Sequence, residues 1–182
     1  LQPLAPVAGL IYSDNIPASN RGLLSWWQGE GNATDSADGN SGTLQGGTTF
    51  ASGQIGQGFQ FDGVDDYVNI PDSTTLDSLT TAATVSMWIK PEGPGYIFSR
   101  RDPLLKEQIS LFFDGVNLGL VVGTATAVSV YYTAPGVVTT GAFYHIAATV
   151  NTVTGFAKLY VNGVDLPLST TFGPSTLSGT LA

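Results

Sequence analysis

The sequence predicts an all-β protein of the sandwich or barrel class, and three observations support this. Short runs in which apolar and polar residues alternate recur along the chain, and no long helical period is present. The 182 residues include 23 Gly and 10 Pro but only 11% charged residues, which is typical of short strands joined by tight turns. The dipeptides Asp114-Gly115 and Asn162-Gly163 lie between alternating runs, where such pairs are strong hairpin signals.

The sequence divides into an arm and one compact domain. Residues 1–20 are expected to form an extended arm or linker, because three prolines exclude a helix, although residues 8–12 suit one strand. Residues 21–182 are expected to form a single sandwich domain with a sizeable core. The Gly-rich stretch 29–47 predicts turns. The expected strands are 23–27, 83–90, 96–99, 108–113, 118–122, 127–132, 144–150, 156–161 and 164–168.

Charge and composition exclude several classes of partner. The net charge is -8 with only six Lys and Arg residues, which argues against binding nucleic acid or an anionic membrane surface. The longest apolar runs are far shorter than the roughly 20 residues that a membrane-spanning helix needs, so we expect no membrane insertion. The chain has no Cys, so its stability must come from packing, hydrogen bonds or a cation bound through oxygen.

An acidic turn is the feature with the clearest chemistry. Asp62, Asp65 and Asp66 fall within five residues, between runs in which Phe59 with Phe61 and Tyr67 with Asn69 share a face. Hard cations such as Ca²⁺ bind carboxylate and backbone oxygens in irregular loops. A solvated turn without a metal is the alternative interpretation of the same residues.

Five segments together resemble a known family. They are LSWWQGEGNA (24–33), GQGFQFDGVDDYV (56–68), VSMWIKP (85–91), YHIAAT (144–149) and KLYVNGV (158–164). In this order they resemble the concanavalin A-like, laminin-G-like domains common in secreted bacterial proteins. The resemblance covers about residues 22–168 and implies a two-sheet antiparallel jelly-roll sandwich for the domain 21–182. It also implies an extracellular or cell-surface location and, in many members, one Ca²⁺.

The resemblance also shapes two expectations about missing parts and metal ligands. Family members close with a strand pair that carries an acidic segment, and this sequence lacks that pattern, so a closing C-terminal strand is expected to be absent. Either the chain continues further or another segment, with residues 1–20 as the spare piece, fills the sheet. The expected Ca²⁺ ligands are Asp62 and Asp65 together with Asp35 and Asn32 of the preceding loop.

Candidate ligand-binding residues are few, and catalysis has little support. Trp88 and Arg100 are the candidates for contacting a sugar, with core packing and a solvated charge as their alternatives. The three glutamates lack the spacing of the carboxylate pair of jelly-roll glucanases, so we expect no enzyme activity. His145, the single histidine, is interpreted as structural.

Two functions remain from the sequence. The first is a non-catalytic extracellular module that binds carbohydrate or mediates adhesion. The alternative is a structural subunit of a filament or other extracellular assembly, in which copies of the chain join by strand donation. In that alternative residues 5–12 add to a neighbouring sheet, and Val7, Leu10 or Tyr12 fill its apolar grooves.

Overall fold

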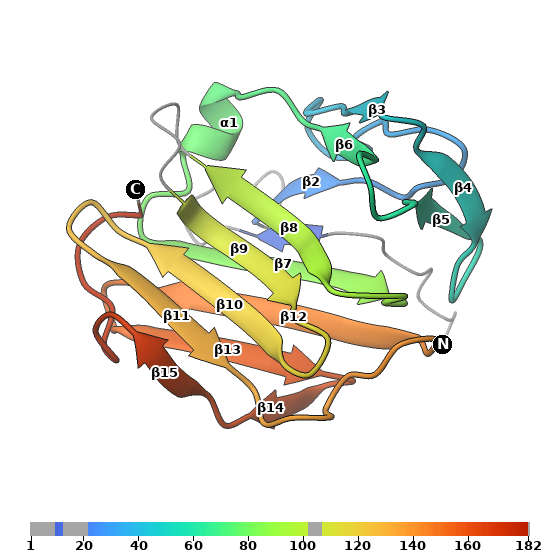
Figure 1. Ribbon diagram of the computed structural model, residues 1–182. Coiled ribbons are helices and arrows are strands. Elements are labelled where there is room, and N and C mark those ends of the chain that lie inside the picture. The colour runs from blue at the N-terminus through green and yellow to red at the C-terminus, as the bar shows by residue number, and fades with distance from the viewer. Residues whose placement is uncertain (1–9, 13–21, 102–106, 182) are drawn as a thin grey trace, which may run out of the picture. The chain divides into compact units, whose positions relative to one another are not determined.

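The computed structural model describes residues 10–12, 22–101 and 107–181, and it is almost entirely β (Figure 1). The chain divides into two compact units. Unit 1 consists of Leu1–Ser78 with Val85–Trp88, and unit 2 consists of Leu79–Thr84 with Ile89–Ala182. Among the described residues the one helix is α1 (Thr74–Asp77), and Ser73 caps it by accepting the Leu76 N–H through its side chain.

Unit 2 contains a five-stranded antiparallel sheet in the order β15-β11-β10-β9-β8. Each neighbouring pair of strands is antiparallel, and β9 and β10 form the hairpin that Asp114-Gly115 predicts, with Gly115 at φ +96°. The strands are β8 (Gly95–Arg101), β9 (Glu107–Phe113), β10 (Leu118–Gly123), β11 (Val128–Tyr132) and β15 (Ser169–Phe172). The first four agree with the predicted strands to within three residues, whereas β15 was not predicted.

The second sheet of unit 2 contains β14-β13-β12; next to β12 is β7, whose residues belong partly to unit 2 and partly to unit 1. The strands are β7 (Ala82–Ile89), β12 (Tyr144–Asn151), β13 (Phe156–Val161) and β14 (Val164–Leu166). Asn162 at φ +50° and Gly163 at φ +81° make the predicted tight turn between β13 and β14. Both sheets of the jelly-roll sandwich are therefore antiparallel, as the sequence predicts.

The core of unit 2 is formed by apolar side chains of both its sheets; burial alternates along β12, whereas every residue of β10 is buried. Leu111 of β9 lies opposite Leu120 of β10, and both side chains are fully buried. Ile146 of β12 and Leu159 of β13 are equally buried in the second sheet. Burying a Leu or Ile side chain contributes about 1.5–3 kcal/mol, so these two inward faces hold the sheets of this unit together.

Unit 1 contains β2-β1-β7 and two small two-stranded sheets. In the first small sheet β3 (Thr43–Gln45) pairs with β6 (Tyr67–Asn69), and in the second β4 (Thr49–Ser52) pairs with β5 (Gln57–Gln60). The runs on either side of the acidic turn, β5 and β6, therefore do not pair with each other. The acidic segment instead connects two different sheets.

In the structure residues 10–12, which the alternative function would add to a neighbouring subunit, pair within their own chain. Strand β1 (Leu10–Tyr12) pairs antiparallel with β2 (Leu23–Trp26) of the same chain and lies between β2 and β7. Both backbone edges of Leu10–Tyr12 are thus used within the chain, which agrees with the alternative in which the arm fills the sheet. Val7 lies outside the described residues.

Candidate functional site

The outward face of the five-stranded sheet carries a row of aromatic side chains. Tyr96 of β8 lies opposite Phe112 of β9, Phe112 lies opposite Gly119 of β10, and Gly119 lies opposite Tyr132 of β11. Because successive side chains of a strand point to opposite faces, these residues alternate with buried core residues such as Leu111. The row therefore crosses four adjacent strands on the face away from the core, and Tyr96 is 61% exposed.

The rings in this row contact one another. The Tyr96 and Phe112 ring centroids are 6.0 Å apart, and those of Phe112 and Tyr132 are 5.5 Å apart with the rings edge to face. Gly119 makes this arrangement possible, because a Cβ at that position would lie 2.2 Å from Cζ of Phe112. The Phe112 ring therefore rests on bare backbone between its two aromatic neighbours.

A shallow groove of about 540 Å³ follows the row. Its lining comes from all five strands, and it includes Phe172 of β15, whose side chain is 65% exposed. The residues that line it are Gly95, Tyr96, Phe112, Phe113, Val121, Val128, Val130, Tyr132 and Phe172. This lining is apolar and aromatic, so it offers flat surfaces rather than a charged or catalytic cleft. We call it the aromatic groove.

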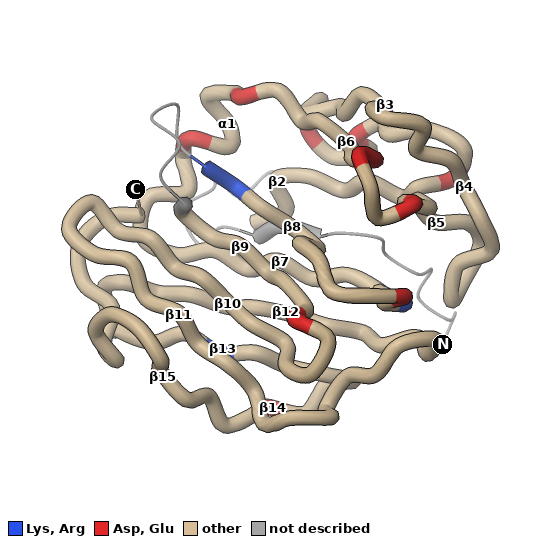
Figure 2. The backbone as a smooth tube through the Cα atoms, in the orientation of Figure 1, with Lys and Arg blue, Asp and Glu red and all other residues tan. Residues whose placement is uncertain are grey.

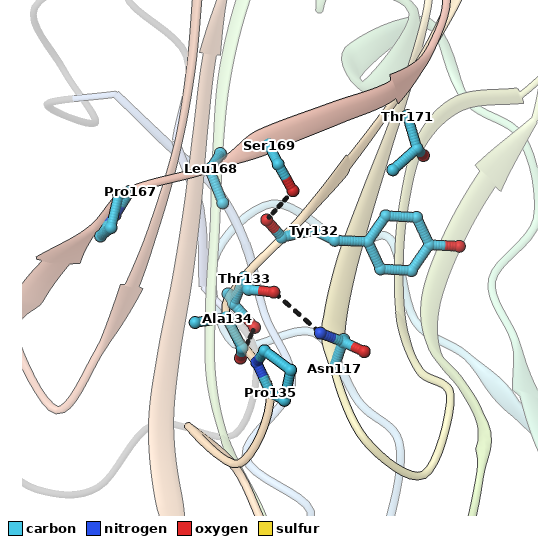
Figure 3. Close-up of a pocket in the computed structure, with 9 residues that line it drawn as sticks. All are labelled: Asn117, Tyr132, Thr133, Ala134, Pro135, Pro167, Leu168, Ser169 and Thr171. Atoms are coloured by element: carbon cyan, nitrogen blue, oxygen red, sulfur yellow. Dashed lines mark hydrogen bonds between the residues drawn. The ribbon is translucent and has the colours of Figure 1, made fainter.

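A second groove of about 680 Å³ also has Tyr132 in its lining (Figure 3). It is more polar than the aromatic groove, and we call it the polar groove. Figure 3 shows Asn117 donating its amide N–H to the Thr133 carbonyl at 2.9 Å, and Ser169 donating to the Tyr132 carbonyl at 3.4 Å. The residues that line it are Asn117, Tyr132, Thr133, Ala134, Pro135, Pro167, Leu168, Ser169 and Thr171.

Charged residues are scarce around both grooves. Strands β10, β11 and β15 carry no charged residue at all, as Figure 2 shows. At the β8 end of the row the Arg101 guanidinium lies 5.9 Å from the Tyr96 ring centroid, within cation–π range. None of the described residues that line the two grooves is an Asp or Glu, so neither lining offers a carboxylate pair for hydrolysis.

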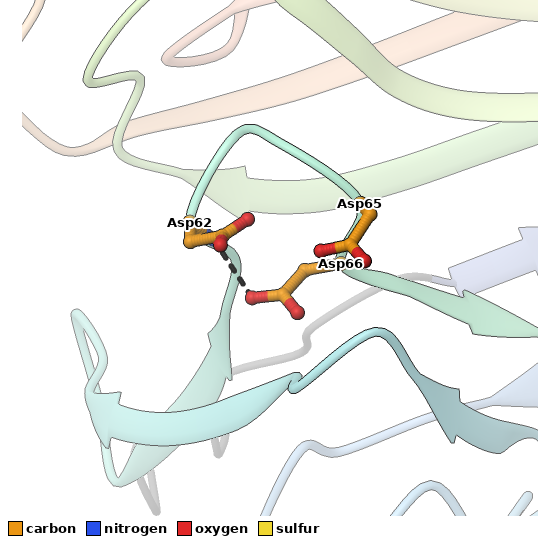
Figure 4. A group of neighbouring side chains, drawn as sticks. All are labelled: Asp62, Asp65 and Asp66. Atoms are coloured by element: carbon orange, nitrogen blue, oxygen red, sulfur yellow. Dashed lines mark hydrogen bonds between the residues drawn. The ribbon is translucent and has the colours of Figure 1, made fainter.

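The acidic segment of unit 1 gathers three carboxylates (Figure 4). Oxygens of Asp62, Asp65 and Asp66 lie within 4.8 Å of one another. Asp66 Oδ2 accepts the Asp62 N–H at 2.9 Å, and Asp62 Oδ1 accepts the Val64 N–H at 2.8 Å, with Gly63 at φ +78° between them. The structure thus brings Asp62 and Asp65 together, as predicted, and adds Asp66. An oxygen-only cluster of this kind fits the ligand preference of Ca²⁺.

Asp35 lies outside this cluster and organises its own loop. Its Oδ1 accepts the N–H groups of Trp26 at 2.8 Å and Ala37 at 2.9 Å, and its Oδ2 accepts that of Asn40 at 2.9 Å. Burial by itself would raise the pKa of Asp35, but these backbone N–H groups outweigh it and hold the pKa below its usual value. Asn32 likewise forms a local turn by accepting the Thr34 N–H at 2.9 Å.

Comparison with known proteins identifies the family. The family model described as the concanavalin A-like lectin/glucanases superfamily matches residues 62–181. The chain belongs to this superfamily. The match confirms the resemblance that the sequence motifs indicate, and it includes all of the residues that line both grooves. A search of curated proteins finds no match.

One solved structure is similar in fold to this chain. It is domain 4 of AbnA, a GH43 extracellular arabinanase from Geobacillus stearothermophilus, in complex with arabinotriose. The two are 23% identical, with a TM-score of 0.54, over 82% of this chain and 75% of that one. At this identity the likeness establishes the fold.

No helix among the described residues is long and apolar enough to cross a membrane.

The predicted ligand residues do not line either groove of this concanavalin A-like domain. Trp88 lies half-buried in β7, and Arg100 donates its Nε–H to Gln108 Oε1. The residues that do line the aromatic groove were missed, although the alternation of Gln108, Ser110 and Phe112 against Ile109, Leu111 and Phe113 marks one aromatic outward position. Which strands would place further rings beside Phe112 could not be inferred from one strand alone.

Proposed function

We propose that this chain is a non-catalytic carbohydrate-binding module and that its sugar ligand lies in the aromatic groove. The observation that carries the proposal is the row Tyr96, Phe112 and Tyr132, with Phe172 beside it, on one outward sheet face. The family includes lectins, and the similar arabinanase domain was solved with arabinotriose. Both facts favour a sugar as the ligand.

The chemistry of the groove suits a sugar ring. The apolar C–H face of a sugar stacks against a flat aromatic ring, which buries apolar area on both partners. The hydroxyl groups of the same sugar need hydrogen-bond partners at the edge, and Thr171 with Ser169 on the exposed strand β15 supplies hydroxyls there. Ring stacking with a polar edge therefore provides both affinity and orientation.

We propose binding without hydrolysis and a site of action outside the cell. Glycoside hydrolysis by this fold class uses two carboxylates on either side of the scissile bond. Glu92 forms an ion pair with Lys90 at 2.9 Å, and Glu30 accepts the Gln57 N–H at 3.0 Å, so both have structural partners away from the grooves. Polysaccharides outside the cell are the partners that such a face would meet, and the similar arabinanase is extracellular.

The test is binding to a panel of soluble polysaccharides by affinity electrophoresis, followed by titration calorimetry on those that retard the protein. Arabinan, xylan, galactan and mixed-linkage glucan form the panel. Tyr132→Ala should weaken binding about tenfold or more, which corresponds to about 1.4 kcal/mol. Tyr67→Ala is the matched control, because Tyr67 is an exposed tyrosine of β6 outside both grooves. Unchanged binding by a folded Tyr132→Ala variant contradicts the proposed site.

We also propose that Asp62, Asp65 and Asp66 hold a structural Ca²⁺. The supporting observation is the convergence of three carboxylates that repel one another without a cation. The ion would supply charge neutralisation and would fix the connection between β5 and β6. Binding to the folded state alone should raise the melting temperature as calcium is added. Equal melting curves in chelator and in millimolar calcium, with Asp65→Asn as the comparison variant, would contradict this site.

A further inference from the structure

The two grooves on the five-stranded sheet share one side chain. Tyr132 lines both, with the aromatic rings of β8 and β9 on one side and the polar groups that follow β11 and precede β15 on the other. The backbone carbonyl of Tyr132 accepts from Ser169, which ties the end of β11 to the start of β15 at this point. The two linings also meet on β15, where Thr171 lines the polar groove and the adjacent Phe172 lines the aromatic groove.

The direction of the combined surface follows from the strand register. One cross-strand line runs through Tyr96, Phe112, Gly119, Tyr132 and Ser169, at right angles to the strands. Five strands give four spacings of about 4.8 Å, so the line is about 19 Å long. That length exceeds a single sugar ring several times over, and the rings lie along it rather than in one pocket. A linear ligand therefore fits this surface better than a compact one.

Charge restricts the kind of linear ligand. None of the described residues that line the two grooves is Asp, Glu, Lys or Arg. The whole chain carries a net charge of -8, so an anionic polymer would be repelled at long range, and none of the lining residues would offset this, although Arg101 lies beside Tyr96 at the β8 end of the row. An uncharged ligand avoids both costs.

We propose that the two grooves form one continuous site for an internal segment of an uncharged polysaccharide. The inference rests on the proposed function and deepens it by naming the ligand class and the extent of the site. Sugar rings stack along Tyr96, Phe112 and Tyr132, and the next units extend past Tyr132 into the polar groove. There Thr171, Ser169 and the Asn117 amide provide hydrogen bonds to sugar hydroxyls. Both grooves are shallow, so the polysaccharide can continue beyond either end of the site, and binding does not require a terminal sugar unit.

The first experiment measures affinity against ligand length. Arabino-, xylo- and cello-oligosaccharides from disaccharide to hexasaccharide are titrated by calorimetry against the full chain. The series whose parent polysaccharide binds should gain affinity with each added unit, by about tenfold or more in total from the shortest to the longest member. Equal affinity of the disaccharide and the hexasaccharide overturns the continuous site while leaving the proposed function intact. If no member of the panel of neutral polysaccharides binds, the proposed function itself fails.

The second experiment separates the two grooves by mutation. Thr171→Val and Ser169→Ala remove exposed hydroxyls of the polar groove with little change in shape. They should weaken binding of the hexasaccharide about threefold to tenfold and leave the disaccharide unchanged. Tyr132→Ala should weaken both. If the polar-groove variants bind the hexasaccharide as the original chain does, the ligand does not pass Tyr132 and the proposal is wrong.

The third experiment tests charge and the competing occupant. Polygalacturonate should bind at least about tenfold more weakly than the best neutral polysaccharide at low salt, and equal or tighter binding overturns the ligand class. A second copy of the chain is the other occupant that an exposed aromatic face could attract. Sedimentation velocity should show a monomer at concentrations used for titration. A dimer that Tyr132→Ala abolishes would assign this face to self-association and overturn the proposal.

Discussion

Replacing Asp35 by Asn tests whether this carboxylate organises its loop or belongs to a cation site. The side chain is buried, with 7% of its surface exposed. Its Oδ1 holds the N–H groups of Trp26 and Ala37, and its Oδ2 holds that of Asn40, all at 2.8–2.9 Å. Asn retains one acceptor oxygen, so one of these groups of donors must lose its partner and face an amide NH₂ instead.

The expected loss of stability follows from these bonds. If the Asn oxygen keeps the N–H groups of Trp26 and Ala37 as donors, two charge-assisted hydrogen bonds become neutral ones, which costs about 1 kcal/mol each. The Asn40 N–H is then left without its acceptor in a buried position, which costs about 1–3 kcal/mol more. Asp35→Asn should therefore lower the free energy of unfolding by about 3 to 5 kcal/mol. That is a large share of the 5–15 kcal/mol typical of a domain.

Urea unfolding followed by tryptophan fluorescence, in chelator and in millimolar calcium, measures this loss. We expect Asp35→Asn to lose the same free energy in both solutions. Asp65→Asn, on the exposed cluster, should stay within about 0.5 kcal/mol of the original chain in chelator and should lose any gain that calcium provides. Original stability of Asp35→Asn in chelator, or a loss seen only with calcium, would refute the loop role and favour Asp35 as a metal ligand.

The pH dependence gives an independent check on the same carboxylate. The pKa of Asp35 in the folded chain is held below its usual value of 3.8, so the charged form is favoured by folding. The stability that it contributes is present above pH 3.8 and is lost as the pH falls through the folded pKa. The difference between the original chain and Asp35→Asn should therefore shrink in strongly acidic solution.

Three further predictions concern the histidine, the arm and the floor of the aromatic groove. Burial lowers the pKa of His145 below 6.5, so the neutral form is favoured by folding and stability should fall as the pH drops below 6.5. Between pH 7 and pH 5.5 the melting temperature of His145→Gln should fall less than that of the original chain. An equal fall in both proteins would contradict the assignment of this pH dependence to His145. Deleting residues 1–12 should destabilise the chain and promote aggregation, because β2 and β7 lose their common neighbour β1, whereas the full chain should sediment as a monomer. Undiminished stability of the truncated chain would show that β1 contributes nothing to its sheet. Gly119→Ala should displace the Phe112 ring, cost about 1–3 kcal/mol in urea unfolding and weaken polysaccharide binding, and unchanged affinity would mean that the ring position does not matter.

Local sequence was sufficient for most of the strands of unit 2 and for their turns. Alternation over a few residues decides which face of a strand is apolar, and Asp114-Gly115 and Asn162-Gly163 have backbone preferences that need no distant partner. These features are short-range, so one sequence predicts them well. The family resemblance rests on the same local motifs and is confirmed by the match over residues 62–181.

The pairing in unit 1 could not be predicted for the opposite reason. The runs around Asp62 look like two strands of one hairpin, yet β5 pairs back to β4 and β6 pairs back to β3. Hydrogen bonding between strands depends on which apolar faces are buried together, and that choice is made over the whole fold. The cluster Asp62, Asp65 and Asp66 survives this change because all three lie in one short segment.

The sequence by itself determined an all-β sandwich, its tight turns and the position of its acidic cluster. It also showed that the chain lacks the positive charge that binding nucleic acid would need. Only the tertiary structure decided where a ligand can lie. Tyr96, Phe112 and Tyr132 are brought into one row by the register of β8, β9, β10 and β11, and Gly119 keeps that row level. Register is a property of paired strands and not of any one of them. For that reason the row of aromatic side chains cannot be inferred from the sequence and is recognised only in the folded structure.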